Sequence, residues 1–91
     1  MNYSNEMQSI VAKYAELLFT ISDIALLICV DKDILRDDIA DNSTNISKLY
    51  HSSKLVTIAK LRRQEIEQAE LGSNTAIELV SKYIIDQNLD E

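Results

Sequence analysis

The sequence predicts an all-α protein of about five helices, in which a helix-turn-helix is followed by a long helix and a C-terminal helix. The 91 residues include no proline and a single glycine, so the two residue types that most strongly interrupt helices are almost missing. No stretch alternates apolar and polar residues between turn signals, as a half-buried strand would. Because a chain of this length usually forms one domain, we expect a single helical domain over residues 1–91.

The first three helices are placed by apolar spacing and by capping residues. Apolar side chains recur at helical spacing between Ile10 and Leu18, which predicts a first helix over residues 5–19. Thr20 and Asp31 are residue types that cap helix N-termini. They precede helices predicted over residues 21–28 and 32–40, so the helix-turn-helix covers residues 20–40.

Two further helices are predicted after the loop at residues 41–45, DNSTN, whose side chains tend to bond their own backbone. The long helix is expected over residues 46–71 and ends before Gly72, which can adopt the left-handed conformation of a helix C-cap. The last helix is expected over residues 75–88, with Ser73, Asn74 and Thr75 supplying caps and with Thr75 and Glu78 as a candidate capping box.

The long helix has apolar residues on almost every side when it is advanced by about 100° per residue. A helix with this pattern either lies at the centre of its domain or contacts another subunit. We therefore expect self-association, with a central helix wrapped by the other four as the alternative. The residues concerned are Leu49, Tyr50, Leu55, Val56, Ile58, Ala59, Leu61, Ile66 and Ala69.

The segment over residues 20–40 has the features that a helix-turn-helix needs. Ala25 is small enough for the point where the two helices cross, and Cys29 stands where the turn often has glycine. Apolar residues that can lock the two helices together are Ile24, Ile28, Val30, Leu35 and Ile39.

The second helix of this pair is unusually acidic for a DNA-reading helix. Lys32 and Arg36 lie along one edge of its expected exposed side, and Asp33, Asp37 and Asp41 lie opposite the core. Carboxylates on that side oppose docking on phosphates, which supply much of the affinity for DNA. The acidic residues either bind a basic partner or are a solvated surface.

Charge is segregated along the chain, whose net charge is −6. Residues 1–43 carry three basic and eight acidic side chains, and residues 64–91 carry one basic and seven acidic side chains. Between them, residues 44–63 carry five basic side chains and no acidic one, and we call this segment the basic belt. The pattern indicates either an ordinary solvated surface or a surface for self-association or for a polyanion.

The sequence gives little support for a disulfide, a metal site, a membrane span or catalysis. Cys29 is the only cysteine, so no internal disulfide can form, and we expect a reducing cytoplasm and a buried structural thiol. His51 is the only histidine and has no second ligand at metal spacing. No apolar run approaches the roughly 18–20 residues of a membrane span. We expect no membrane association, no metal or cofactor, and no enzymatic activity.

The order of motifs resembles the small subunits of tailed-phage terminases. The resemblance covers about residues 11–85 and is carried by FTISDIALLICVDKDILRDDI, by HSSKLVTIAKLRRQEIEQAELG and by GSNTAIELVSKYI. It implies a helix-turn-helix followed by a long helix, a glycine-containing turn and a last helix. It also implies ring assembly, recognition of viral DNA, regulation of the terminase large subunit, and action in the cytoplasm of a bacterial host. Carried over, the DNA-binding residues are Lys32, Arg36, Lys48, Lys54, Lys60, Arg62 and Arg63.

The sequence therefore predicts a non-catalytic phage or prophage DNA-binding protein that acts as an oligomer in viral DNA recognition or packaging. DNA contacts are expected to go mainly to phosphates, from the basic belt and from Lys32 and Arg36. The alternative is a helical protein-interaction module, or a small prophage regulator, whose acidic helix binds a basic protein partner.

Overall fold

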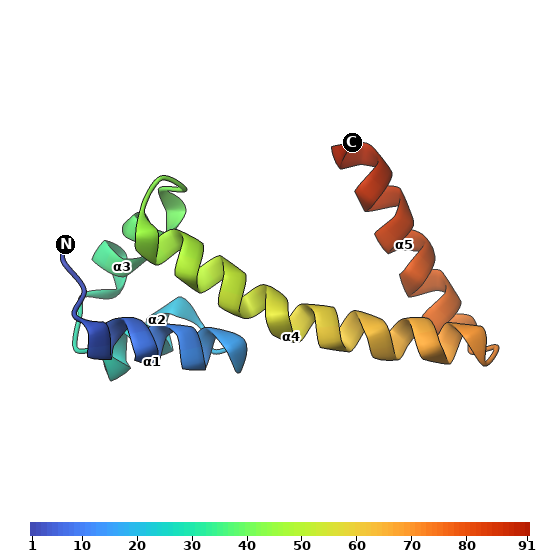
Figure 1. Cartoon of the computed structure of the whole chain (residues 1–91), viewed down its shortest axis with the longest axis horizontal. Helices are drawn as coiled ribbons and strands as arrows, with labels where there is room; N and C mark the ends of the chain where they lie inside the picture. Colours follow the sequence, from blue (N-terminus) through green and yellow to red (C-terminus); the bar gives the residue numbers. More distant parts are fainter. The chain divides into compact units, whose positions relative to one another are not determined.

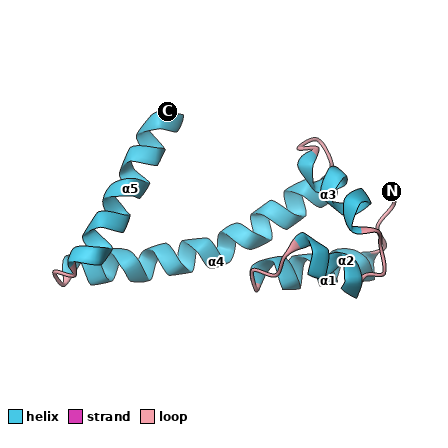
Figure 2. Ribbon diagram, turned by 180° about the vertical axis from the view of Figure 1, so that it is seen from behind, coloured by secondary structure: helices cyan, strands magenta, loops and turns pink.

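The computed structural model describes residues 1–91 and contains five helices and no strand (Figure 1; Figure 2). The expected all-α class with about five helices is confirmed. The helices are α1 (Asn5–Glu16), α2 (Ile21–Leu27), α3 (Lys32–Ala40), α4 (Asn45–Glu70) and α5 (Asn74–Asp90).

Side chains cap the starts of all five helices by accepting hydrogen bonds from otherwise unpaired backbone N–H groups. At α4 the Thr44 hydroxyl accepts from the N–H of Ser47 at 3.1 Å. Thr20 caps α2 and Asp31 caps α3, as the sequence predicts, and Ser4 caps α1. The predicted capping box at Thr75 is wrong, because Ser73 caps α5 by accepting from the N–H of Ala76 at 3.3 Å. Ser73 is extended and directly follows the turn, so the helix starts one residue earlier than expected.

Helices α1, α2 and α4 end in the same backbone motif, in which a left-handed residue lets two amides bond back to the helix. At the end of α4 this residue is Gly72, with φ of 95°, and at the other two it is Leu18, with φ of 64°, and Cys29, with φ of 57°. The left-handed Leu18 explains why α1 ends at Glu16 and not at residue 19. Cys29 is exposed, so the expected buried thiol is wrong.

The chain divides into two compact units, Met1–Thr57 and Ile58–Glu91, and α4 contributes residues to both. Chain length predicts one helical domain over residues 1–91, whereas the structure groups the residues into two. The first unit holds nearly all of the buried apolar side chains, which are Val11, Ala15, Ile24, Ala25, Ile28, Leu35, Ile39, Ile46 and Tyr50.

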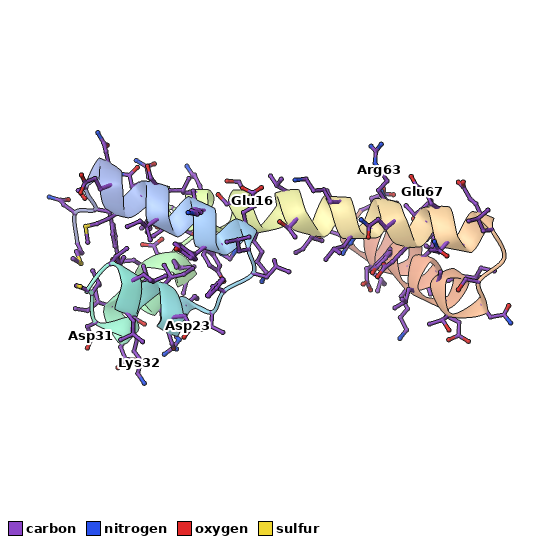
Figure 3. All side chains as sticks on the ribbon, turned by 90° about the horizontal axis from the view of Figure 1, so that it is seen from below. Glu16, Asp23, Asp31, Lys32, Arg63 and Glu67 are labelled. Carbon is purple, nitrogen blue, oxygen red and sulfur yellow. The ribbon has the colours of Figure 1, made fainter.

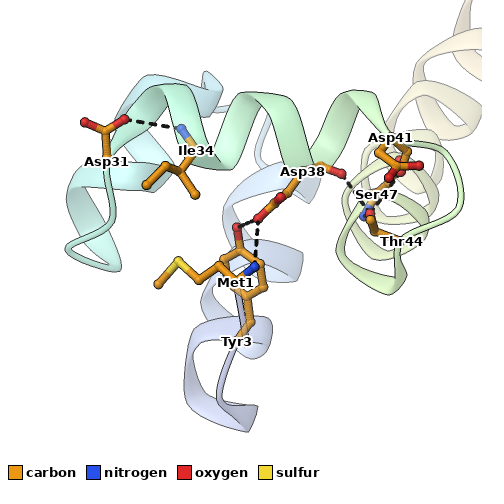
Figure 4. Close-up of polar contacts among 8 residues, drawn as sticks. All are labelled: Met1, Tyr3, Asp31, Ile34, Asp38, Asp41, Thr44 and Ser47. Carbon is orange, nitrogen blue, oxygen red and sulfur yellow. Dashed lines mark hydrogen bonds and ion pairs between the residues drawn. The ribbon is translucent and has the colours of Figure 1, made fainter.

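Polar contacts tie the ends of the first unit's helices together (Figure 4). The buried Ser47 hydroxyl donates to the carbonyl of Ile39 at 2.6 Å, and the Thr44 hydroxyl donates to the carbonyl of Asp38 at 2.7 Å. The Tyr3 hydroxyl donates to the carboxylate of Asp38 at 2.6 Å. These bonds hold α3 against the start of α4 and against the segment before α1.

The second unit consists of the rest of α4, the turn at Gly72, and α5, and its helices are held by few buried groups. Ala76 is the only buried residue in it. The guanidinium of Arg62 lies over the ring of Tyr83, 4.2 Å from its centroid, and the Tyr83 hydroxyl donates to Glu65. Large apolar side chains exposed in this unit are Leu61, Ile66, Leu71, Ile77, Ile84, Ile85 and Leu89.

The division into units explains the apolar pattern of α4. Its buried residues in the first unit are Ile46, Ser47 and Tyr50, whereas its half-buried residues in the second unit include Ile58 and Ala69. The apolar residues of α4 therefore pack in two separate units, each part of the helix within its own unit.

Candidate nucleic-acid interface

The turn between α2 and α3 is fixed by its own backbone and by one carboxylate. The N–H of Val30 donates to the carbonyl of Ala25 at 3.0 Å, across the left-handed Cys29. The carboxylate of Asp31 then accepts from the N–H groups of Asp33 and Ile34, at 2.8 and 3.2 Å. With Ala25 buried at the crossing, these contacts give α2 and α3 the arrangement that the sequence predicts for residues 20–40.

Burial of Leu35 and Ile39 sets which side of α3 faces solvent. Asp33, Asp37 and Asp41 are exposed, as expected from their positions opposite those two residues. Because all three carboxylates lie on the solvent side, this side of α3 carries negative charge where a groove-reading helix would meet phosphates and base edges.

Hydrogen bonds from Ser43 favour the ionised form of the Asp41 carboxylate. Its Oδ1 accepts from the hydroxyl of Ser43 at 2.6 Å and from the N–H of Ser43 at 3.0 Å. These hydrogen bonds, the one to the hydroxyl first, lower the pKa of Asp41 below its ordinary value. Asp38 differs from Asp33, Asp37 and Asp41 because it is half-buried and accepts a hydrogen bond from Tyr3. Its carboxylate therefore points into the first unit.

Arg36 is held by partners on its own unit. Its guanidinium donates to the carboxylate of Asp33 at 3.2 Å and to the hydroxyl of Ser22 on α2, also at 3.2 Å. Both members of the ion pair are largely exposed, and such pairs contribute about 0–1 kcal/mol. A phosphate can therefore replace Asp33 as the partner of Arg36 at small cost.

Lys32 is the cation best placed for a phosphate on the helix-turn-helix. It lies in the first turn of α3, is exposed, and has no ion pair. Figure 3 shows it projecting from the start of α3, beside Asp31 and away from α1. Lys48 and Lys54 are also exposed, on the part of α4 that belongs to the same unit.

The other three predicted site residues, Lys60, Arg62 and Arg63, belong to the second unit. The stacking of Arg62 on Tyr83 gives that guanidinium a structural role between α4 and α5. The hydrogen bond to Glu65 is the main cause of a raised pKa at Tyr83. The sequence did not predict the contact of Arg62 with Tyr83. Its only sign in the sequence is that Tyr83 stands in an apolar pattern.

The seven predicted residues therefore do not form one surface. Lys32 and Arg36 lie on α3, whereas the five belt residues lie along α4 and are divided between the units. At about 100° per residue, the five project around much of the helix. The basic belt is continuous in sequence but not on one side of α4.

The helix-turn-helix also exposes apolar side chains that the sequence pattern did not reveal. Leu26 is 78% exposed and Ile34 is 47% exposed. A groove of about 420 Å³ beside Leu26 is lined by Ser22, Ala25, Leu26, Val30, Asp31 and Lys32. The apolar run LLICV could have suggested this exposure, but the same run supplies Ile28 to the core.

Comparison with family models, curated proteins and solved structures finds no match to this chain. None of the five helices combines the length and apolar character needed to cross a bilayer.

Proposed function

We propose that this chain is a non-catalytic DNA-binding protein of a tailed phage or prophage, similar to a terminase small subunit. Its role would be viral DNA recognition or packaging, as an oligomer. The observation that carries the proposal is the packed pair α2 and α3, joined by the left-handed Cys29 and followed by the long helix α4. The terminase large subunit is the protein partner that the resemblance implies.

Binding would go to phosphates and not to base edges. Lys32, Lys48 and Lys54 are exposed cations of the first unit without ion pairs, and Arg36 can exchange Asp33 for a phosphate. Phosphate contacts from side chains position a protein on a duplex but carry no sequence information. Asp33 and Asp37 on the solvent side of α3 oppose its insertion into the major groove.

Oligomerisation is supported by the second unit. Its large apolar side chains are mostly exposed, and Ala76 is its only buried residue. Weak phosphate contacts from one copy would add along a duplex when several copies are joined, since linked sites bind with a high effective concentration.

Charge reversal of the first unit's lysines tests the DNA-binding proposal. Three variants should each weaken binding to any duplex sequence: Lys32→Glu, Lys48→Glu and Lys54→Glu. Each should also make the slope of log affinity against log salt concentration less steep by about one, because one phosphate contact is lost. Lys82→Glu, an exposed position on α5, is the matched control because it changes the net charge equally. The measurement is gel retardation at several salt concentrations.

Two results would contradict the proposal. One is equal weakening by Lys82→Glu and by the three test variants, which would indicate a net-charge effect only. The other is no retardation by the folded wild-type chain at low salt.

A second candidate function is a protein-interaction module whose acidic α3 binds a basic protein partner. The observation that favours it is the exposure of Leu26 and Ile34 on the helix pair that also exposes Asp33 and Asp37. Apolar side chains rimmed by charge are typical of protein-binding surfaces.

A further inference from the structure

One side of the α4–α5 hairpin exposes apolar side chains among charged ones. Two grooves, of about 440 and 470 Å³, share Arg62 and Ile66 among their lining residues. We call the apolar residues of these grooves the hairpin face, which comprises Ala59, Ile66, Val80 and Ile84. Ile66 is 42% exposed and Ile84 is 53% exposed, so large apolar groups of both helices face solvent on this side.

The second unit buries little of its own apolar surface. It runs from Ile58 to Glu91, and Ala76 is its only buried residue. Units shorter than roughly 40 residues are usually supported by disulfides, metals or oligomerisation. The only cysteine, Cys29, lies outside this unit, and association through the hairpin face would cover its exposed apolar groups.

The spacing of the hairpin face fits another helix. Ala59 and Ile66 are seven residues apart on α4, and Val80 and Ile84 are four apart on α5. Apolar residues at these spacings lie on one side of a helix and form the seams along which helices pack side chains into one another. The occupant of this side is therefore expected to be helical.

The charges along α4 favour a second copy of this helix as the partner on the hairpin face, in the antiparallel direction. Lys60, Arg62 and Arg63 come first, and Glu65, Glu67 and Glu70 follow, within one segment of the helix. A second copy of α4 in the parallel direction would place like charges together. An antiparallel copy places each basic part beside an acidic part, which favours pairing and sets its register.

We propose that a second copy of this chain binds on the hairpin face, with the two α4 helices antiparallel about a two-fold axis next to Ile66. Arg63 of each copy then lies beside Glu70 of the other. Figure 3 shows Arg63 projecting from α4 on the side away from α5, which leaves its charge available to a partner. This pairing rests on the self-association part of the proposed function, and not on DNA binding. It gives a closed dimer and not the ring that the resemblance implies.

Arg63 and Glu70 allow a charge-swap test that detects contacts between two chains and not contacts within one chain. They are two helical turns apart, about 10 Å along the axis, so they do not pair within one helix. Arg63→Glu and Glu70→Arg should each weaken association about tenfold, because symmetry replaces two attractions by two repulsions. An equimolar mixture should recover wild-type association, since all pairs between the two variants are then of opposite charge.

Sedimentation equilibrium of the full chains without DNA, alone and mixed, measures these affinities. Wild-type association that neither variant weakens would overturn the pairing, as would a mixture that associates no better than its components. A wild-type chain that stays monomeric over the whole concentration range would also overturn it. Because no DNA is present, failure of DNA binding leaves the result unchanged.

A second pair of variants tests the apolar part of the face. Ile66→Asn with Ile84→Asn should abolish association, whereas Leu26→Asn, at an exposed leucine of the first unit, should leave it intact. Circular dichroism follows helix content in the same samples. Equal loss of association in both would show that the hairpin face has no special role.

Discussion

Leu18 and Cys29 are held in a backbone conformation that suits glycine. Their φ angles are 64° and 57°, in the left-handed region where a Cβ atom lies close to the following carbonyl oxygen. The conformation persists because each residue lets two amides bond back to the preceding helix, as at Gly72. The turn of the helix-turn-helix therefore keeps its geometry at the cost of local strain.

Replacing Cys29 with glycine should stabilise the protein. Relief of left-handed strain is worth roughly 1–2 kcal/mol, and the greater freedom of glycine in the unfolded chain offsets about 0.5–1 kcal/mol of it. The expected gain is about 0.5–1 kcal/mol in the free energy of unfolding, measured by urea denaturation. Cys29→Ala keeps the Cβ atom and should change little, and a loss of stability in Cys29→Gly would contradict this account.

Tyr3 links the first unit's stability to pH. Its burial, and then its hydrogen bond and proximity to the carboxylate of Asp38, raise the pKa of Tyr3 above its ordinary value of 10.0. Since the folded-state pKa lies above the unfolded value, the neutral phenol stabilises the fold below pH 10.0. That stabilisation is lost progressively as the pH rises beyond it.

The free energy of unfolding should therefore fall less steeply above this pH in Tyr3→Phe than in the wild type. At neutral pH the same variant should cost about 0.5–1.5 kcal/mol, because the bond to Asp38 is lost. Denaturation at a series of pH values measures both effects. Tyr83 is present in both proteins, so its own raised pKa cancels in the comparison, and identical slopes would refute the role of Tyr3.

At the scale of elements, α3 separates the two candidate functions. Asp33→Asn with Asp37→Asn removes two exposed charges and leaves the buried Leu35 and Ile39 untouched. If the chain binds phosphates, the double variant should bind DNA several-fold more tightly, because like-charge repulsion is removed. If α3 binds a basic protein instead, capture of a lysine-rich peptide should be lost with no gain in DNA affinity.

Sequence alone predicted the helices well where a capping side chain and a turn residue agree. Thr20 and Asp31 cap helices at the expected positions, and Gly72 ends the long helix. The end of α1 was missed because leucine is a poor predictor of a left-handed residue. For the last helix the sequence offers Ser73, Asn74 and Thr75 as caps, and it cannot choose among them because each is a suitable capping residue; the structure selects Ser73.

The candidate site was less predictable because it depends on contacts between elements. Helical spacing along α3 correctly placed Leu35 and Ile39 on the buried side. It also correctly placed Asp33, Asp37 and Asp41 on the exposed side. It could not show that Arg36 reaches Ser22 on α2, or that Arg62 stacks on Tyr83 of α5. Those contacts decide which cations are available to a phosphate. They join residues of different helices, which spacing along the sequence does not relate.

At the scale of the whole molecule, the core and the basic residues are divided between the units. The first unit holds the core and the cations Lys32, Lys48 and Lys54, whereas the second holds Lys60 and both arginines of the belt and buries only Ala76. The net charge of −6 opposes approach to DNA. The proposed binding therefore depends on a few local phosphate contacts that several joined copies repeat.

The salt dependence of DNA affinity tests this central claim most directly. Fluorescence anisotropy of a labelled duplex gives the association constant at each salt concentration. Three phosphate contacts per copy predict a logarithmic slope of roughly −3 per bound chain, similar for unrelated duplex sequences. A folded protein that shows no binding at low salt, or an affinity independent of salt, would contradict the proposal that these lysines bind phosphates.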